Sequence, residues 1–404
     1  MAAATVFFAA IPFSMAEGIS ADASAACGQA DCVSLLCSYS LNGEEEMKRP
    51  NILYDGSLRT KQKLGPDTFL QISIPEETDT AKLFLSFYSM PVPYSVTEYD
   101  SEGNAITCTR PETDLLMPVL PVSGNTSVIT VVPEASCTIS ECSLYTAGSD
   151  PAAFHTFSKT SDKLDYLIVS AHPDDEQLYL GGVAPICSDR GLKGTILYMT
   201  CNRRERYTES LNACYTAGIR QMPLFLWLED GTVKQNMIWK HWDRDAVLLD
   251  LVRVLRRTRP EVVVTHHFGG EYGQGLHIAT AEAVAESVQL AADSTYDPGA
   301  EPWQVKKLYI HMHDEITVTL PVNDPLPSFK GRTALEVTRE AFRKHRSEFK
   351  KLHLEANASG PYDLSKYGLY YTTVGPDTGK NDLFENIPDS CLTRFCCIGG
   401  RAGA

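Results

Sequence analysis

Length, composition and charge limit the classes of protein that this chain can form. At about 150 residues per domain, 404 residues suggest two or three domains. A hydrophobic content of 43% and a charged content of 22% are typical of globular domains with a sizeable core. The net charge of −15 disfavours nucleic acid and anionic membranes as main partners, because both need a positive surface. An uncharged or cationic small ligand is compatible with this charge.

The N-terminal region carries signs of export. An apolar run in the first 18 residues ends near small residues and resembles the end of a secretory signal, for which we expect cleavage after Ala16, although no Lys or Arg precedes Lys48. An even set of six cysteines precedes residue 150, as disulfides in an oxidising compartment would need. We therefore expect residues 1–25 to be a signal or a flexible segment, and the protein to be secreted or at the cell surface. The six cysteines are Cys27, Cys32, Cys37, Cys108, Cys137 and Cys142.

Residues 35–147 predict a smaller all-β sandwich domain. Short segments rich in β-branched and aromatic residues are separated by turn residues such as Asp55-Gly56, and no segment of helical period intervenes. The expected strands include residues 68–75, 81–89, 94–100 and 126–133.

The order of motifs in this region resembles the discoidin or galactose-binding-like sandwiches. LYDGSLRT is followed by QISIP, by LFLSFY and by a strand that ends in EYDSEGN. Such domains often accompany secreted carbohydrate enzymes. The resemblance implies either a carbohydrate-binding module or a purely structural appendage.

After a polar, turn-rich linker at residues 148–162, apolar runs begin to alternate with helical segments. This alternation predicts a doubly wound, mostly parallel Rossmann-like α/β domain over residues 163–386, followed by a tail at 387–404. Since ligands bind at the carboxyl ends of such strands, the polar residues after each strand should meet in one crevice. We expect strands at 165–171, 194–200, 223–228 and 261–267, a helical stretch to about Arg190, and helices at 205–219, 243–259 and 277–293.

The run AHPDDE directly follows the first of these strands. His172 and Asp175, three residues apart at a turn that Pro173 restricts, can hold one cation, and Asp174 is left as a nearby base. Glu176 would orient the loop or a ligand. The alternative is an acidic first turn of a helix, favoured by the helix dipole, which leaves His172 unexplained. The pattern predicts a zinc-type metal site.

A third metal ligand is expected after the fourth strand, in THHFGGEYGQGLHIAT. His277 opens a helix behind a glycine-rich loop, which would place its ring at the crevice. His266, at the end of the strand, is the competing candidate, and His267 is more typical of packing or surface positions.

Together these two runs resemble the PIG-L or LmbE-like de-N-acetylase family, over about residues 163–386. Members carry an (A/P)HPDDE run and a later GHPDH-type run. The resemblance implies that His172, Asp175 and His277 bind zinc, that Asp174 is the general base, and that Tyr272 assists the oxyanion. Gln274 stands where the family has a histidine; glutamine can donate a hydrogen bond to an oxyanion but cannot deliver a proton.

Two further segments match the family pattern. RYTESLNACYTAG fits its R-x-x-E-x-x-x-A helix, which implies that Arg206 reaches the substrate; the alternative is a surface pair with Glu209. Asp230 in LEDGT would bind sugar hydroxyls, or it belongs to a simple Asp-Gly turn. Arg203 and Arg204 are expected to be charges at the rim. Sugar stacking and core packing are both open for the tryptophans Trp227, Trp242 and Trp303.

The expected function is the metal-dependent hydrolysis of an N-acetyl or other N-acyl group on an amino sugar or glycan, with one catalytic zinc or another divalent ion. The alternative is a glycan-binding protein whose deacetylase domain Gln274 has weakened or disabled. A metal-dependent amidase that acts on something other than a sugar is a further possibility.

Overall fold

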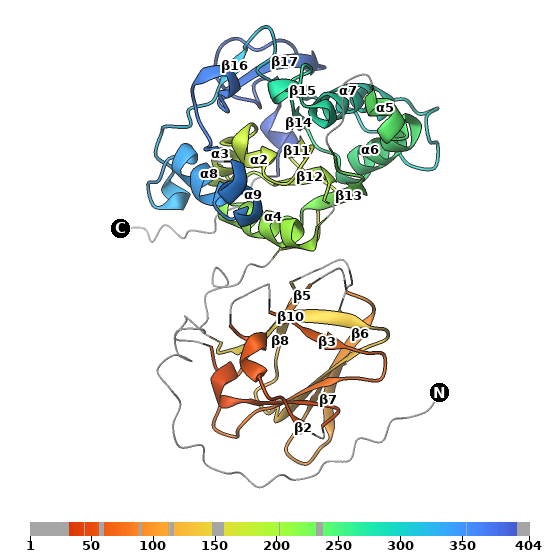
Figure 1. Cartoon of the computed structure of the whole chain (residues 1–404), viewed down its shortest axis with the longest axis vertical. Coiled ribbons are helices and arrows are strands. Elements are labelled where there is room, and N and C mark those ends of the chain that lie inside the picture. Colours follow the sequence, from red (N-terminus) through yellow and green to blue (C-terminus); the bar gives the residue numbers. More distant parts are fainter. Residues whose placement is uncertain are drawn as a thin grey trace. The chain divides into compact units, whose positions relative to one another are not determined.

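The structure is a computed structural model. The chain forms two compact units, residues 1–157 and residues 158–404 (Figure 1). This division falls within the stretch 148–162 that the sequence predicts as a linker. The predictions for residues 1–25 and for Cys27, and most of the linker and tail, lie outside the described residues. The described residues are 32–43, 45–55, 60–88, 91–111, 113, 117–147, 157–201, 203–231, 237–352 and 354–393.

The described part of the first unit is built from two antiparallel sheets, as the strand pattern predicts. In β6 the buried positions alternate, with Tyr94, Val96 and Glu98 on the inner face. The six-stranded sheet has the order β2-β1-β4-β9-β6-β7 and consists of β1 (Ser38–Leu41), β2 (Glu45–Glu46), β4 (Leu70–Ser73), β6 (Tyr94–Tyr99), β7 (Ala105–Thr109) and β9 (Val128–Pro133). The four-stranded sheet has the order β3-β10-β5-β8 and consists of β3 (Gln62–Leu64), β5 (Lys82–Phe87), β8 (Val119–Pro121) and β10 (Cys137–Tyr145). The likeness to discoidin domains stays a prediction.

The cysteines of this unit differ from the expected disulfide framework. Cys32 is disulfide-bonded, but Cys37, Cys108, Cys137 and Cys142 are free thiols. Burial explains this for Cys142, which packs as a small apolar side chain at 0% exposure. The even number of cysteines was therefore a poor guide to pairing.

The second unit contains a seven-stranded sheet of order β13-β12-β11-β14-β15-β17-β16. Its first five strands are parallel, and β17 and β16 are antiparallel additions at one edge. The chain runs outward from β11 to β13 and then returns to β14 on the other side of β11. The topological switch point of this α/β sheet therefore lies between β11 and β14. The strands are β11 (Tyr166–Ser170), β12 (Gly194–Thr200), β13 (Leu224–Leu228), β14 (Val262–Thr265), β15 (Lys307–His311), β16 (Val318–Thr319) and β17 (Lys366–Thr372).

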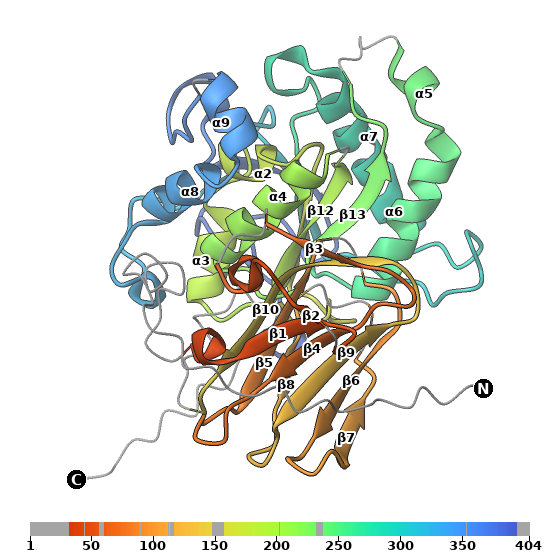
Figure 2. The same cartoon turned by 60° about the horizontal axis from the view of Figure 1, so that its bottom comes forward.

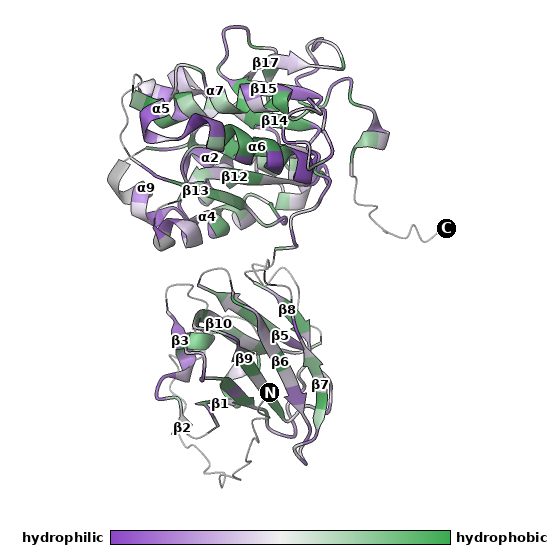
Figure 3. Ribbon diagram, turned by 90° about the vertical axis from the view of Figure 1, so that its right-hand side faces the viewer, coloured by the Kyte–Doolittle hydropathy of each residue, from purple (hydrophilic) through white to green (hydrophobic). Residues whose placement is uncertain are grey.

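Helices cover both faces of this sheet, which explains why its central strands are continuous apolar runs. Every residue of β11, β12 and β14 is buried, and Figure 3 shows β14 as a hydrophobic strand. Helices α5, α6 and α7 lie on one side, and α2, α3, α4, α8 and α9 lie on the other (Figure 2). The helices are α2 (Asp175–Leu178), α3 (Val183–Asp189), α4 (Arg204–Thr216), α5 (Ile238–His241), α6 (Arg244–Thr258), α7 (Gly275–Leu290), α8 (Ala334–Phe342) and α9 (Arg346–Leu352).

The structure confirms the strands and helices that the sequence predicts between residues 165 and 293. Within the described residues, no helix is long and apolar enough to span a membrane.

Candidate functional site

A cavity of about 860 Å³ lies at the carboxyl ends of the parallel strands. The residues that follow β11, β12, β13 and β14 all contribute to its lining, through Asp174, Arg206, Asp230 and Gln274. The convergence that the strand pattern predicts is therefore confirmed. A C-terminal segment, residues 354–362, supplies a further wall.

The loop after β11 reverses sharply before α2 begins. Asp174 stands at the N-terminus of α2 with φ 112° and ψ −35°, a conformation that L residues rarely adopt. The loop is buried, and the side chains of Asp174 and Asp175 belong to residues that are only 4% and 3% exposed. Because the backbone turns at Asp174, the two adjacent carboxylates point to different partners.

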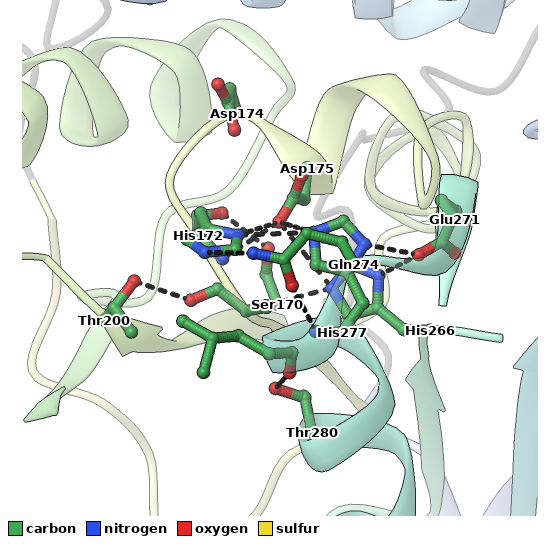
Figure 4. A network of polar contacts seen from close by, with 12 residues as sticks. Ser170, His172, Asp174, Asp175, Thr200, His266, Glu271, Gln274, His277 and Thr280 are labelled. Atoms are coloured by element: carbon green, nitrogen blue, oxygen red, sulfur yellow. Dashed lines mark hydrogen bonds and ion pairs between the residues drawn. The ribbon is translucent and has the colours of Figure 1, made fainter. Parts of the chain in front are cut away.

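Three potential ligand atoms from this loop and from α7 lie at one point (Figure 4). His172 Nδ1 is 2.9 Å from Asp175 Oδ2 and 3.2 Å from His277 Nε2. His277 Nε2 is in turn 3.1 Å from Asp175 Oδ2. All three residues are buried. The structure thus brings together the three predicted ligands.

The spacing of these atoms fits a tetrahedral metal ion. With bonds of about 2.0–2.1 Å, two ligands on a tetrahedral zinc lie about 3.3 Å apart. The three separations found, 2.9, 3.1 and 3.2 Å, are within a few tenths of an ångström of that value. Two imidazoles and one carboxylate are also a donor set that zinc accepts while an open position remains.

Glu271 fixes which nitrogen His277 presents to this point. Its Oε2 lies 2.7 Å from His277 Nδ1, and its Oε1 lies 2.7 Å from His311 Nδ1. Since a carboxylate only accepts, Nδ1 of His277 carries the hydrogen and Nε2 keeps a free lone pair. Glu271 follows Gly270, which has φ 64° and where a Cβ would lie 2.6 Å from the Gln274 carbonyl oxygen.

His266, the competing candidate for the third ligand, is engaged elsewhere. The Ala171 N–H donates to its Nε2 at 2.9 Å, and its Nδ1 lies 2.8 Å from Glu271 Oε2. Its Nε2 lone pair is therefore occupied by a backbone hydrogen bond. The geometry favours His277 over His266 as the ligand. His267 is half-buried and accepts a hydrogen bond from the Gly269 N–H through its Nδ1.

Arg206 lies among the acidic residues of the cavity. Its Nη2 is 3.3 Å from Asp174 Oδ2, and its Nη1 is 3.4 Å from Asp230 Oδ2. Another hydrogen bond joins Nη2 to the Pro173 carbonyl oxygen. Glu209, the expected surface partner of Arg206, accepts from Ser347, and Arg206 and Glu209 are both buried, at 7% and 4% exposure. The surface-pair alternative is therefore not what the structure contains.

Asp230 also contacts His172, with 3.4 Å between Oδ1 and Nε2. The hydrogen bond with His172 holds the pKa of Asp230 below its ordinary range, against the effect of burial. Asp230 is thus part of the site as well as of an Asp-Gly turn, because it can orient the ring of His172.

Burial raises the pKa of the Asp174 carboxyl, the charge of Asp175 raises it further, and Arg206 opposes both. For Glu271, burial also acts to raise the pKa, but His266, His277 and His311 outweigh it and hold the pKa well below the usual value. Arg206 and the three histidines are therefore the groups that favour the charged carboxylates here.

Tyr272 and Gln274, the expected oxyanion donors, both line the cavity. Tyr272 is 61% exposed and has φ 50°. Gln274 caps α7, since its Oε1 accepts the His277 N–H at 2.9 Å. Its Nε2 lies 3.3 Å from His172 Nε2. The amide group of Gln274 is therefore oriented by the helix end, with its nitrogen beside His172.

The tryptophans and the rim arginine differ in their surroundings. Trp242 is 3% exposed and belongs to the core, and the Trp303 Nε1–H donates to the Pro260 carbonyl. Trp227 is 53% exposed. Arg203 pairs with Glu348, a cavity residue, at 2.6 Å.

Sequence reasoning missed Glu271, His311 and Glu348. Glu271 is a single acidic residue in a run rich in histidine and glycine, a combination that could have suggested a partner for a metal-binding imidazole. His311 and Glu348 have no such signal, because they reach the site from distant elements.

A match to a family model covers part of the second unit. Residues 167–288 match the PIG-L family, described as GlcNAc-PI de-N-acetylase. The match includes both the AHPDDE run and the segment that carries His277.

The chain is also similar to curated deacetylases. It is 28% identical over 174 residues to the 1D-myo-inositol 2-acetamido-2-deoxy-alpha-D-glucopyranoside deacetylase of Thermobispora bispora, covering 35% of this chain and 57% of that protein. With a deacetylase of the same description from Saccharopolyspora erythraea, it shares 46% identity over 177 residues, or 35% of this chain and 63% of that protein. The chain thus spans somewhat more than half the length of these curated relatives.

Among solved structures, the N,N'-diacetylchitobiose deacetylase from Pyrococcus horikoshii is similar over 48% of this chain and 74% of the deacetylase chain. The TM-score is 0.37 and the identity is 19%. The curated relatives are enzymes, so they do not favour the alternative of a protein that only binds glycans.

Proposed function

We propose that this protein is a metal-dependent hydrolase that removes an N-acetyl group from an amino sugar or glycan. The observation that carries the proposal is the convergence of the ligand atoms of His172, Asp175 and His277 at one point, next to a cavity that His172, Asp175 and Asp174 line. The match of residues 167–288 to a de-N-acetylase family, and the similarity to amino-sugar deacetylases, support it.

The metal that we propose is zinc. His172 Nδ1, Asp175 Oδ2 and His277 Nε2 would hold it, and their separations support a tetrahedral ion. When bound, zinc would polarise the acyl carbonyl and lower the pKa of a water molecule.

The residues of the chain then carry the proton and the charge. Asp174 accepts a proton from the attacking water, whose oxygen joins the acyl carbon, and the same proton is available to the amine when the C–N bond breaks. Tyr272 and the amide of Gln274 are the donors that the cavity offers to the oxygen that gains charge. Arg206 and Asp230 bind substrate hydroxyls in this proposal. The products are acetate and the free amino sugar.

For the first unit, we propose a discoidin or galactose-binding-like module that binds carbohydrate. Its antiparallel sheets support this assignment. We also propose that the protein is secreted or located at the cell surface, and the disulfide at Cys32 supports export.

The test is acetate release from N-acetylglucosamine compounds by the full chain and by Asp174→Asn. Because a positioned base contributes about 10²–10⁴ in rate, we expect Asp174→Asn to lower kcat by that factor while the bound metal stays unchanged. Asp324→Asn, a change at an exposed turn, is the matched control. If Asp174→Asn keeps full activity, Asp174 is not the base; if the wild type releases no acetate from any acetylated sugar, the proposed function is wrong.

A further inference from the structure

The loop that carries Asp174 is held from behind by a buried pair. The Asp174 N–H donates to Glu176 Oε2 at 2.7 Å, and Glu176 Oε1 lies 2.6 Å from His345 Nε2. Glu176 is 2% exposed and His345 is 0% exposed. The two carboxylate oxygens of Glu176 therefore connect the backbone of Asp174 to His345, which lies 169 positions after Glu176 in the chain.

This connection acts at a strained residue. Asp174 has φ 112°, and a non-glycine residue in such a sparsely populated region costs about 1–3 kcal/mol, so surrounding contacts must hold it there. The Glu176 carboxylate meets the N–H of that same residue, while Arg206 meets its side chain and the Pro173 carbonyl. The backbone and the carboxyl of Asp174 are thus held by different groups.

His345 belongs to a segment that is attached to the site at several points. It lies between α8 and α9, and two residues later Ser347 donates through both its N–H and its hydroxyl to Glu209 of α4. Glu348 lines the cavity, and its Oε1 is 4.0 Å from Arg206 Nε. Residues 345–348 lie beyond the segment matched by the family model, which ends at residue 288.

We propose that Glu176 and His345 are positioning residues for the reaction, which hold Asp174 in the conformation that its role as base needs. This inference rests on the proposed function. Without the carboxylate of Glu176, the Asp174 backbone relaxes toward negative φ and its carboxyl moves away from the reacting atoms. A displacement of about 1 Å at a reacting group can cost about 10²-fold in rate.

The test compares Glu176→Met with Glu176→Gln in the full-length, zinc-loaded protein. Both residues resemble glutamate in length, but only glutamine keeps an acceptor for the Asp174 N–H. We expect Glu176→Met to lower kcat about 10- to 100-fold with KM and bound zinc unchanged, and Glu176→Gln to recover most of the loss. Asp377→Asn is the control, because Asp377 forms a buried network with Lys307, Tyr309 and Thr317 outside the cavity lining.

A second variant and a second measurement keep the proposal testable if Glu176→Met does not fold. The double variant Glu176→Gln, His345→Met has no buried charge at this pair, and we expect a kcat loss about tenfold greater than in Glu176→Gln alone. Hydrogen exchange of the peptide that contains Asp174 should be faster in Glu176→Met and in the double variant than in the wild type, whether or not the protein releases acetate. Absence of acetate release in the wild type would therefore contradict the proposed function, and the exchange rates would still decide the positioning role.

An unchanged kcat in Glu176→Met would overturn the proposal. The proposal would also be overturned if Glu176→Met and Asp377→Asn lowered Tm equally and lost equal activity. The pair of Glu176 and His345 would then only stabilise the fold. Unchanged exchange at Asp174 in the disrupted variants would have the same consequence.

Discussion

The oxygen and the nitrogen of the Gln274 amide group have different contacts. The oxygen accepts the His277 N–H and caps α7, and the nitrogen lies beside His172. In the family that the sequence resembles, a histidine stands at this position. Here the side chain both caps the N-terminus of a helix and faces the cavity, so a change at Gln274 also acts on the backbone of His277, which we propose as a metal ligand.

We expect Gln274→His to lower activity rather than raise it. The substitution removes the amide oxygen that caps α7, so the free energy of unfolding should fall by about 1 kcal/mol, and kcat should fall about tenfold as His277 shifts. Acetate release and urea unfolding measure the two effects.

Gln274→Asn is the matched control for that change. Asparagine is a good cap but is one methylene shorter, so stability should be kept while the amide is withdrawn from His172 and activity is lost. A large gain of activity in Gln274→His would instead indicate that Gln274 has disabled a deacetylase.

The residues of the AHPDDE run could be predicted because they are adjacent in the sequence. The chemical roles that we propose for them follow from a histidine and three carboxylates at one strand end. His345 and Glu348 could not be predicted in this way, because His345 meets Glu176 of the run, and Glu348 meets Arg206, through the packing of α8 and α9 against α4. Spacing along the chain carries no information about such contacts.

Glu98 connects three structural elements of the first unit. From β6 its Oε1 accepts from the Thr107 hydroxyl on β7, and its Oε2 accepts from the Ser123 N–H and the Thr126 hydroxyl before β9. Burial acts to raise its pKa, but the hydrogen bonds of Thr126, Ser123 and Thr107 together hold the pKa below its ordinary value.

This carboxylate should make the stability of the first unit depend on pH. Since its pKa is lower in the folded state, its contribution is complete above the unfolded value of about 4.3 and is lost as pH falls through the lowered pKa. We expect Glu98→Ala to cost about 2 kcal/mol at pH 7 and less at pH 3. Urea unfolding of the full chain between pH 3 and pH 7 measures this.

Glu98→Gln controls for shape, because it keeps the size of the side chain and removes the charge. The destabilisation should be smaller than in Glu98→Ala and should also shrink as the pH falls. An equal cost of Glu98→Ala at pH 3 and pH 7 would mean that the hydrogen bonds do not depend on the charge.

The strands of the two units could be predicted from the sequence for different reasons. Buried parallel strands such as β11 and β12 are continuous apolar runs, and half-buried strands such as β6 alternate. The antiparallel strand β17 carries tyrosines at partly exposed positions and follows a long irregular segment. Its place beside β15 depends on pairing across the sheet and has no such pattern.

At the scale of the whole molecule, the charge of −15 and the open cavity are compatible with an uncharged sugar substrate. The two units are separate compact bodies by their internal contacts. The convergence of four strand ends on one cavity was predictable from topology, because parallel strands with alternating helices leave their carboxyl ends at one edge. The disulfide framework was not, because a count of cysteines does not distinguish paired thiols from buried free ones.

Metal-dependent deacetylation is tested by measuring acetate release and bound zinc together on the full chain, before chelation, after chelation and after zinc is added back. We predict one zinc per chain, loss of activity when it is removed, and recovery on return in the wild type but not in His277→Ala. Acetate release at the full rate from metal-free protein would show that the reaction does not depend on the metal.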